Sequence, residues 1–262
     1  MTAEIPDWLG TTRPAKVLRA LVDLFRMQIT ALGDSALIVR VRDRFEDAPE
    51  ETLSEVLAAL RRLENAQIPG VIELAPAYTT VAVFFDPLRV IHDGAEPDGA
   101  IELLIQRIGE ALAGRRRQRK RAASHTAEIP VCYDLEFAID LERVASHTQI
   151  SPSEVVDLHR AAEYRVNCIG FTPGFPYLTG LPNKLATPRH AVPRKEIPAG
   201  SVAIGGTQAG IYPRESPGGW KVIGRTPLRL FDPQRDPPVL LQIGDHVRFR
   251  KITREEFQAL QP

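Results

Sequence analysis

The residues best suited to contact a small ligand are concentrated between positions 170 and 226. The segment 170–178 places three aromatic rings among two prolines and two glycines, and its candidate ligand contacts are Phe171, Gly174, Phe175 and Tyr177. A loop with so little conformational freedom presents its rings in a preorganised way, as a small-ligand pocket requires. A packed turn is the alternative interpretation, and the composition favours neither.

A second segment, residues 204–213, is rich in glycine and supplies Gly205, Gly206, Gln208 and Tyr212. It is typical of a turn between two strands, where glycine permits positive φ angles. Backbone N–H groups exposed by such a turn can also bind a carboxylate or a phosphate. The segment is not a P-loop, because no Gly-Lys-Ser or Gly-Lys-Thr follows it.

Three arginines, Arg189, Arg194 and Arg225, lie near these segments in the sequence. Guanidinium groups bind carboxylates and phosphates through paired hydrogen bonds, so an acidic substrate or ATP would need such donors. Their alternative role is to brace surface loops. We predict that all these segments border one pocket, and the remaining candidate contacts are Ser216, Gly219, Trp220 and Thr226.

The candidates for acid–base catalysis are His159 and Glu163, which lie about one helical turn apart. His159 shares a helical face with apolar residues and is more simply interpreted as a hydrogen-bonded core residue. As a base it could be oriented by Glu163. The sequence contains no HExxH motif, CxxC pair or GxSxG elbow, so neither a dedicated metal site nor a serine hydrolase is predicted.

The composition is that of a globular protein without a global charge. Lys plus Arg and Asp plus Glu both number 33 in 262 residues, so no overall field favours nucleic acid or a membrane. Two cysteines are too few for a disulfide framework, and reduced thiols are expected. Charged residues interrupt the apolar N-terminal residues, so we expect a soluble cytoplasmic protein with no secretory leader.

The elements that must position these residues differ between the two halves of the chain. In the first half, helical spacing follows Pro14 and recurs at residues 53–60 and 101–112, while 36–41, 70–74 and 79–85 are typical of strands. Thr52 and Glu55 have capping-box spacing. The order of these elements predicts a small α+β domain of the split βαβ type.

The second half begins with one strong helix signal, since Ser151 and Glu154 form a capping box around Pro152. From residue 167 to 250, short apolar runs alternate with glycine and proline, which is typical of a closed, mainly antiparallel β-barrel. We therefore expect an N-terminal extension at 1–30, the α+β domain at 31–114, a basic linker at 115–127 and the barrel at 128–262. The linker's arginines are interpreted as solvated, not as a nucleic-acid site.

Several ordered motifs of the chain resemble a known family. They are GFTPGFPYLTGLP at 170–182, PRHAVPR at 188–194, IPAGSVAIGGTQAGIYP at 197–213, SPGGWKVIGRTPLRLFDP at 216–233 and IGDHVRF at 243–249. Together with GDSALIVRV at 33–41, they resemble the KipI and allophanate hydrolase subunit 1 family of carboxyltransferase domains, which includes the B-type subunit of 5-oxoprolinase.

The resemblance implies a cyclophilin-like barrel after the small α+β domain, and a role within a heteromeric hydrolase. Its partners would be a C-type subunit, similar to allophanate hydrolase subunit 2, and an A-type subunit. The complex would use ATP, with Mg in the complex, to open 5-oxo-L-proline to L-glutamate, and the chain alone would be inactive and hold no tightly bound cofactor. Aromatic residues would then bury the substrate's ring while an arginine holds its carboxylate.

Two other functions are compatible with the same resemblance. One is a regulatory inhibitor of a histidine kinase, similar to KipI. The other is a component of an allophanate hydrolase or urea carboxylase, although the chain has no biotin-attachment motif and no fused carboxylase domain. Shared motifs alone do not separate the enzyme component from the kinase inhibitor.

Overall fold

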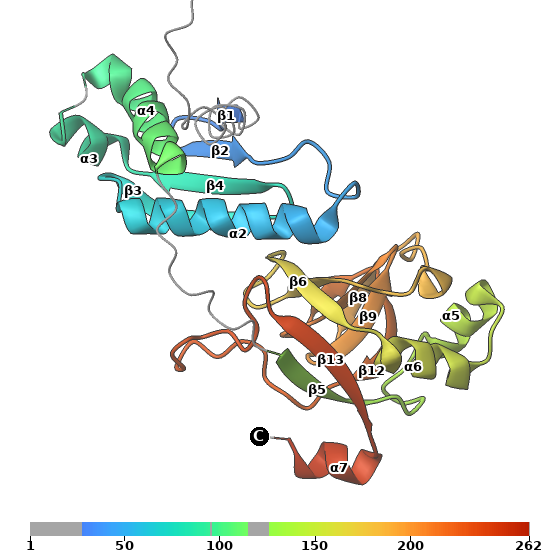
Figure 1. Cartoon of the computed structure of the whole chain (residues 1–262). Coiled ribbons are helices and arrows are strands. Elements are labelled where there is room, and N and C mark those ends of the chain that lie inside the picture. The colour runs from blue at the N-terminus through green and yellow to red at the C-terminus, as the bar shows by residue number, and fades with distance from the viewer. Residues whose placement is uncertain (1–27, 95, 115–125, 262) are drawn as a thin grey trace, which may run out of the picture. The chain divides into compact units, whose positions relative to one another are not determined.

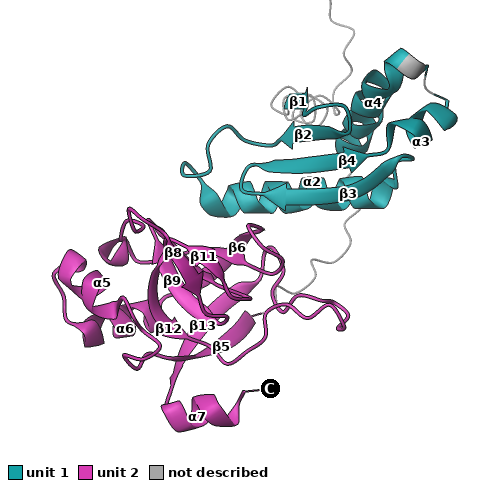
Figure 2. Ribbon diagram, turned by 180° about the vertical axis from the view of Figure 1, so that it is seen from behind, with its two compact units in different colours: residues 1–117 teal, residues 118–262 magenta. Residues whose placement is uncertain are grey.

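The computed structural model describes residues 28–94, 96–114 and 126–261. The chain divides into two compact units, residues 1–117 and 118–262, and each is described by itself (Figure 2). The helix predicted after Pro14 lies outside the described residues. So does most of the predicted basic linker.

The first unit is a four-stranded antiparallel sheet with helices on one face (Figure 1). Its elements are β1 (Gln28–Ala31), β2 (Ala36–Arg40), α2 (Pro49–Ala66), β3 (Val71–Ala77), β4 (Thr80–Phe85), α3 (Pro87–His92), a 3-10 turn (Pro97–Gly99) and α4 (Ala100–Ala113). The strand order is β1-β2-β4-β3, so β4 lies between the two strands that α2 connects. This is the split βαβ arrangement that the sequence predicts.

One apolar core joins the sheet to both long helices of this unit. Every second residue of β4 is buried, and α2 and α4 bury residues at helical spacing against it. The predicted capping box of Thr52 and Glu55 is wrong, because α2 begins earlier, at Pro49. Proline is favoured in the first helical turn since its fixed φ suits a helix and its missing N–H is not needed there. Thr52 instead donates its hydroxyl to the carbonyl of Ala48 at 2.7 Å.

The second unit is built around a closed seven-stranded barrel (Figures 1 and 2). Its elements are β5 (Thr126–Cys132), α5 (Leu141–Thr148), α6 (Pro152–Ala161), β6 (Tyr164–Ile169), β7 (Pro176–Thr179), a 3-10 turn (Asn183–Leu185), β8 (Arg194–Ile197), β9 (Ser201–Gly205), β10 (Gln208–Ile211), β11 (Ser216–Gly218), β12 (Lys221–Arg225), β13 (His246–Ile252) and α7 (Arg254–Ala259). The helix α6 begins as predicted, with Ser151 accepting from the Glu154 amide.

The barrel order is β6-β13-β5-β12-β9-β10-β7, and β7 pairs with β6 to close the ring. All neighbours are antiparallel except β13 and β5, which run parallel. The fold confirms the predicted barrel after the small α+β domain. The strands β8 and β11 form a separate two-stranded sheet.

The strand register separates the inside of the barrel from its outside. All seven barrel strands contribute side chains to the largest apolar core, and only the interior face of a closed barrel can be shared by every strand. Leu178, Ala209 and Ile204 are cross-strand partners within this interior core. Their neighbours Tyr177 and Ala203 therefore face outward, and they belong to a second, smaller aromatic core on the outer surface.

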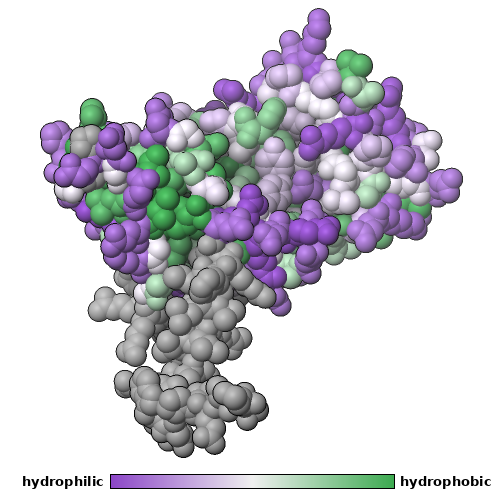
Figure 3. All heavy atoms as spheres, turned by 90° about the horizontal axis from the view of Figure 1, so that it is seen from above, coloured by the Kyte–Doolittle hydropathy of each residue, from purple (hydrophilic) through white to green (hydrophobic). Residues whose placement is uncertain are grey.

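Hydrophobic residues gather in one area of the face shown in Figure 3, and the rest of that face is mainly hydrophilic. Within the described ranges, every helix is too short or too polar to cross a bilayer.

Candidate functional site

The predicted loop and the glycine-rich segment meet in the outer core. Phe175 is buried and packs edge-on against Tyr177, Tyr212 and Trp220, with ring centroids 4.9, 5.2 and 5.6 Å apart. We call these four residues the aromatic cluster. Three of its rings are at most 5% exposed, so they pack against each other and do not face solvent. Phe171 differs, because it is 63% exposed at the edge of the cluster, 5.7 Å from Phe175.

Glycines make room for these rings. A Cβ on Gly205 would lie 2.4 Å from the Trp220 ring, and one on Gly210 would lie 2.8 Å from Phe175. Both distances are shorter than any tolerated contact, so the two positions require glycine. Gly206 has a φ of 66° and forms the turn that leads to Gln208. The glycine-rich segment therefore serves both packing and turn formation.

Two of the predicted arginines lie beside the aromatic cluster. The guanidinium carbon of Arg189 lies 5.5 Å from the centre of the Trp220 ring, within the range of a cation–π contact. Arg189 is exposed and can meet a ligand. Arg194 instead points at Asp140, and both of its terminal nitrogens donate to that carboxylate at 2.7 Å.

Asp140 is the centre of a buried polar network. Its side chain is 0% exposed and accepts hydrogen bonds from Arg194, from the Val222 amide at 2.9 Å and from His190 at 3.1 Å. Burial alone would raise the pKa of Asp140, but the bonds from Arg194, Val222 and His190 outweigh it and hold that pKa below its ordinary value. Asp140 is therefore a fixed negative charge that orients the groups around it.

His190 connects this carboxylate to Lys221, whose Nζ lies 2.9 Å from His190 Nδ1. If Nε2 of His190 carries the proton, it donates to Asp140, and Nδ1 accepts from the ammonium form of Lys221. If Nδ1 carries the proton, it donates to a neutral Lys221 amine, and Nε2 accepts from Arg194 at 2.7 Å. Both protonation states of Lys221 are thus hydrogen-bonded.

Burial lowers the pKa of Lys221, against the attraction of Asp140. A lysine with a lowered pKa is able to donate and accept protons nearer to neutral pH. Lys221 follows Trp220 directly, so the network lies next to the aromatic cluster. This arrangement is suited to proton transfer beside a small bound ligand.

Sequence reasoning did not identify Asp140, His190 and Lys221. The signals were weak, although His190 lies within the motif at 188–194 and Lys221 directly follows the predicted Trp220. Asp140 precedes α5 as its N-cap residue and gives no other sign of its role.

The other predicted contacts occupy structural positions in the barrel wall. Arg225 donates its Nε to the Ala199 carbonyl at 2.7 Å, and the Thr226 hydroxyl accepts from the Leu228 amide. The carbonyl of Gly219 accepts from the His190 amide at 2.6 Å. Ser216 has a buried hydroxyl without a hydrogen-bond partner. Gly174 has a φ of 82° and packs against Phe231, which fixes the turn before Phe175.

The two catalytic candidates do not interact with each other in the hydrogen bonds of the structure. His159 is fully buried, stacks on Phe249 at 4.4 Å, and shares a hydrogen bond with Tyr133 at 2.9 Å. Burial lowers the pKa of His159 to about 3, so the ring is neutral at physiological pH. Glu163 is exposed and pairs with Arg248. This geometry supports the interpretation of His159 as a core residue.

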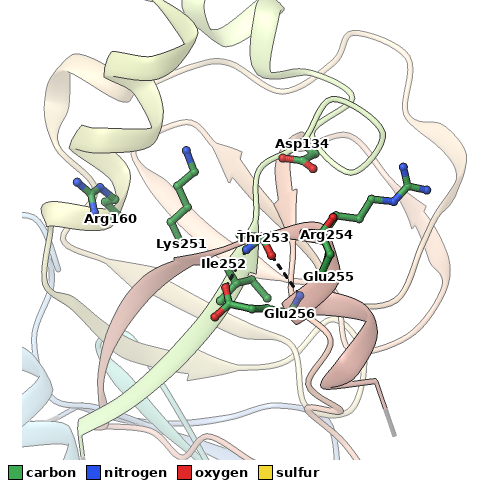
Figure 4. Close-up of a pocket in the computed structure, with 8 residues that line it drawn as sticks. All are labelled: Asp134, Arg160, Lys251, Ile252, Thr253, Arg254, Glu255 and Glu256. Atoms are coloured by element: carbon green, nitrogen blue, oxygen red, sulfur yellow. Dashed lines mark hydrogen bonds between the residues drawn. The ribbon is translucent and has the colours of Figure 1, made fainter.

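A shallow hollow of about 500 Å³ lies elsewhere on the second unit (Figure 4). It is lined by Asp134, Arg160, Lys251, Ile252, Thr253, Arg254, Glu255 and Glu256. Thr253 and Glu256 form a capping box at the start of α7, with bonds of 2.9 and 3.2 Å. The lining carries charges of both signs and none of the predicted contacts, so it does not define a site for the expected acidic substrate.

The described residues contain no group of three or more His, Cys, Asp or Glu side chains able to hold a metal ion. Cys132 and Cys168 are free thiols, as the sequence predicts. Burial raises the pKa of both, which favours the unreactive protonated form.

This fold, with its outer aromatic cluster and buried polar network, is shared with known proteins. Residues 27–241 match the model of the carboxyltransferase domain, subdomain C and D. The chain belongs to this family. It is 43% identical over 235 residues to the B-type subunit of 5-oxoprolinase from Bacillus subtilis strain 168, and the match covers 89% of this chain and 96% of that relative.

Two solved structures extend the comparison. The protein TTHA0988 is 36% identical, with a TM-score of 0.68, and the match covers 83% of this chain but 40% of that longer chain. The Kluyveromyces lactis urea carboxylase has a TM-score of 0.67 over 89% of this chain and 22% of its own. At 20% identity, this second likeness shows the fold alone.

Proposed function

We propose that this chain is the B-type component of an ATP-dependent complex that opens 5-oxo-L-proline to L-glutamate. The observation that carries the proposal is the similarity to a relative named as this component of 5-oxoprolinase, along nearly the whole length of that relative. The proton-transfer network of Asp140, His190 and Lys221 beside the aromatic cluster supports it, because opening a lactam requires a proton at the departing ring nitrogen.

The chemistry explains why ATP is needed. A lactam amide is a poor electrophile, and transfer of a phosphoryl group from ATP to its oxygen activates the carbonyl carbon for attack by water. When the ring C–N bond then breaks, the nitrogen leaves as an amine and must take up a proton. Lys221 in its ammonium form supplies that proton, and His190 keeps the neutral amine hydrogen-bonded afterwards.

The substrate's carboxylate needs a cationic partner. Arg194 is already paired with Asp140, so the exposed Arg189 is the better candidate of the two. In this proposal Arg189 binds the carboxylate, and the aromatic cluster with Phe171 borders the ring. The other predicted contacts retain the supporting positions described above.

The chain has no P-loop motif, and its described residues offer no metal-binding group. We therefore assign Mg-ATP to the complex with a C-type and an A-type subunit, and we expect the chain alone to be inactive. TTHA0988 supports a larger assembly, because the similarity to this chain occupies less than half of that polypeptide.

The test is co-expression of the chain with its C-type and A-type partners, followed by measurement of ATP-dependent glutamate release from 5-oxoproline. The reconstituted complex should turn over, and the isolated chain should not. As a matched pair, Lys221→Met should abolish turnover, whereas Lys195→Met, an exposed lysine on β8, should not. A complex that assembles but releases no glutamate would refute the proposal, and so would turnover by the isolated chain.

A further inference from the structure

The loop between β6 and β7 carries an exposed aromatic residue on a strained backbone. Phe171 has a φ of 66° and is 63% exposed. The Thr172 amide donates to the Gly170 carbonyl at 2.7 Å, so Phe171 is the central residue of a γ-turn with positive φ. Such turns are rare and strained, and a bulky residue at positive φ is an outlier.

The surroundings of Phe171 do not compensate for this strain. Its ring makes an edge contact with Phe175 but stays mostly in solvent, so it gains little from burial. The hydroxyl of the next residue, Thr172, is buried without a hydrogen-bond partner. Stability alone would favour glycine at position 171.

The loop is nevertheless held firmly. Gly170 donates to the Phe175 carbonyl at 3.1 Å, and the Phe175 amide donates to the Thr172 carbonyl at 3.0 Å. Phe175 is itself fixed in the aromatic cluster. The fold thus holds the Phe171 ring in one place at the expense of local stability, and strain of this kind concentrates where ligands bind.

We propose that Phe171 is a specificity-determining residue whose ring packs against the apolar face of a small cyclic substrate at the edge of the aromatic cluster. The proposal rests on the proposed function, in which that substrate is a five-membered lactam. A stable protein interface buries about 800 Å² on each partner and does not depend on one ring in a strained turn. A small ring offers few atoms, so its recognition depends on walls fixed in the right position.

The experiment uses the reconstituted complex and the variant Phe171→Gly. Glycine adopts positive φ without strain, so the Tm should equal or exceed that of the wild type. Loss of the ring should raise the KM for 5-oxoproline about three- to tenfold, the range expected for an aromatic contact. Phe171→Tyr keeps the ring and should keep the KM within about twofold of the wild type.

A matched control separates strain relief from ligand contact. Gln149, which follows α5, also has a positive φ of 58° but does not belong to the aromatic cluster. Gln149→Gly should therefore equal or raise the Tm and leave the KM unchanged.

Three results would overturn the role of Phe171 while the proposed function stands. They are an unchanged KM in Phe171→Gly, a fall in Tm that parallels the loss of activity, and weakened assembly of the complex with a normal KM. A wild-type complex that assembles but does not turn over 5-oxoproline would overturn the proposed function, and this proposal with it.

Discussion

Replacement of Asp140 by alanine tests the buried network most directly. The side chain is 0% exposed and accepts two bonds of 2.7 Å from Arg194, one of 2.9 Å from the Val222 amide and one of 3.1 Å from His190. Removing one partner of a buried ion pair typically costs about 3–5 kcal/mol, because the other charge is left uncompensated. The Arg194 side chain is 29% exposed, so we expect the lower end, about 3 kcal/mol.

For a domain of this size, each kcal/mol shifts the Tm by about 2–4 °C, so Asp140→Ala should lower it by roughly 6–12 °C. The assay is thermal and urea unfolding at neutral pH. Asp157→Ala is the control, because Asp157 forms an exposed ion pair with Arg160 at 3.0 Å, which is worth about 1 kcal/mol at most. Equal effects of the two substitutions would refute the assignment of Asp140 as the centre of the network.

The pH dependence provides a second check on Asp140. Since the fold lowers the pKa of this carboxyl, its contribution to stability is complete above the unfolded value of about 4. The contribution is lost as the pH falls through the lower, folded pKa. The difference in unfolding free energy between the wild type and Asp140→Ala should therefore be constant near neutral pH and shrink below about pH 4. A difference that stays constant to lower pH would contradict the lowered pKa.

Three further substitutions test the site. Lys221→Met should reduce turnover of the complex about 100-fold or more with little change in Tm, and the pH–rate profile of the wild type should contain a pKa below the ordinary lysine value of about 10.4. Arg225→Ala should lower the Tm, because losing the bond to Ala199 costs about 0.5–1.5 kcal/mol; a variant that melts normally but loses ten- to a hundredfold activity would make Arg225 a ligand contact instead. Gly205→Ala should destabilise the protein by about 1–3 kcal/mol, because the added methyl group would overlap Trp220, whereas Gly109→Ala, in an open position on α4, should be neutral or stabilising.

The sequence predicted most of the architecture because periodicity and turn residues are local signals. Helical spacing located α4 and α6, and glycine and proline separated the barrel strands. The start of α2 was misplaced, because a Thr-x-x-Glu pattern was given more weight than the nearby Pro49. The aromatic residues of the loop were also found from sequence, but the choice between pocket wall and packed turn was not.

What the sequence by itself determined was therefore the set of elements, the family and the segments from which the site is drawn. Tertiary structure decided which side chains in those segments meet. His190 and Lys221 lie 31 positions apart, and His190 lies 50 from Asp140, so no helical or strand spacing relates them. Closure of the barrel brings β12 beside the start of α5, and the loop at residue 190 supplies the histidine between them. The same closure turns Tyr177 and Ala203 outward, because neighbouring residues of a strand face opposite sides of the barrel wall.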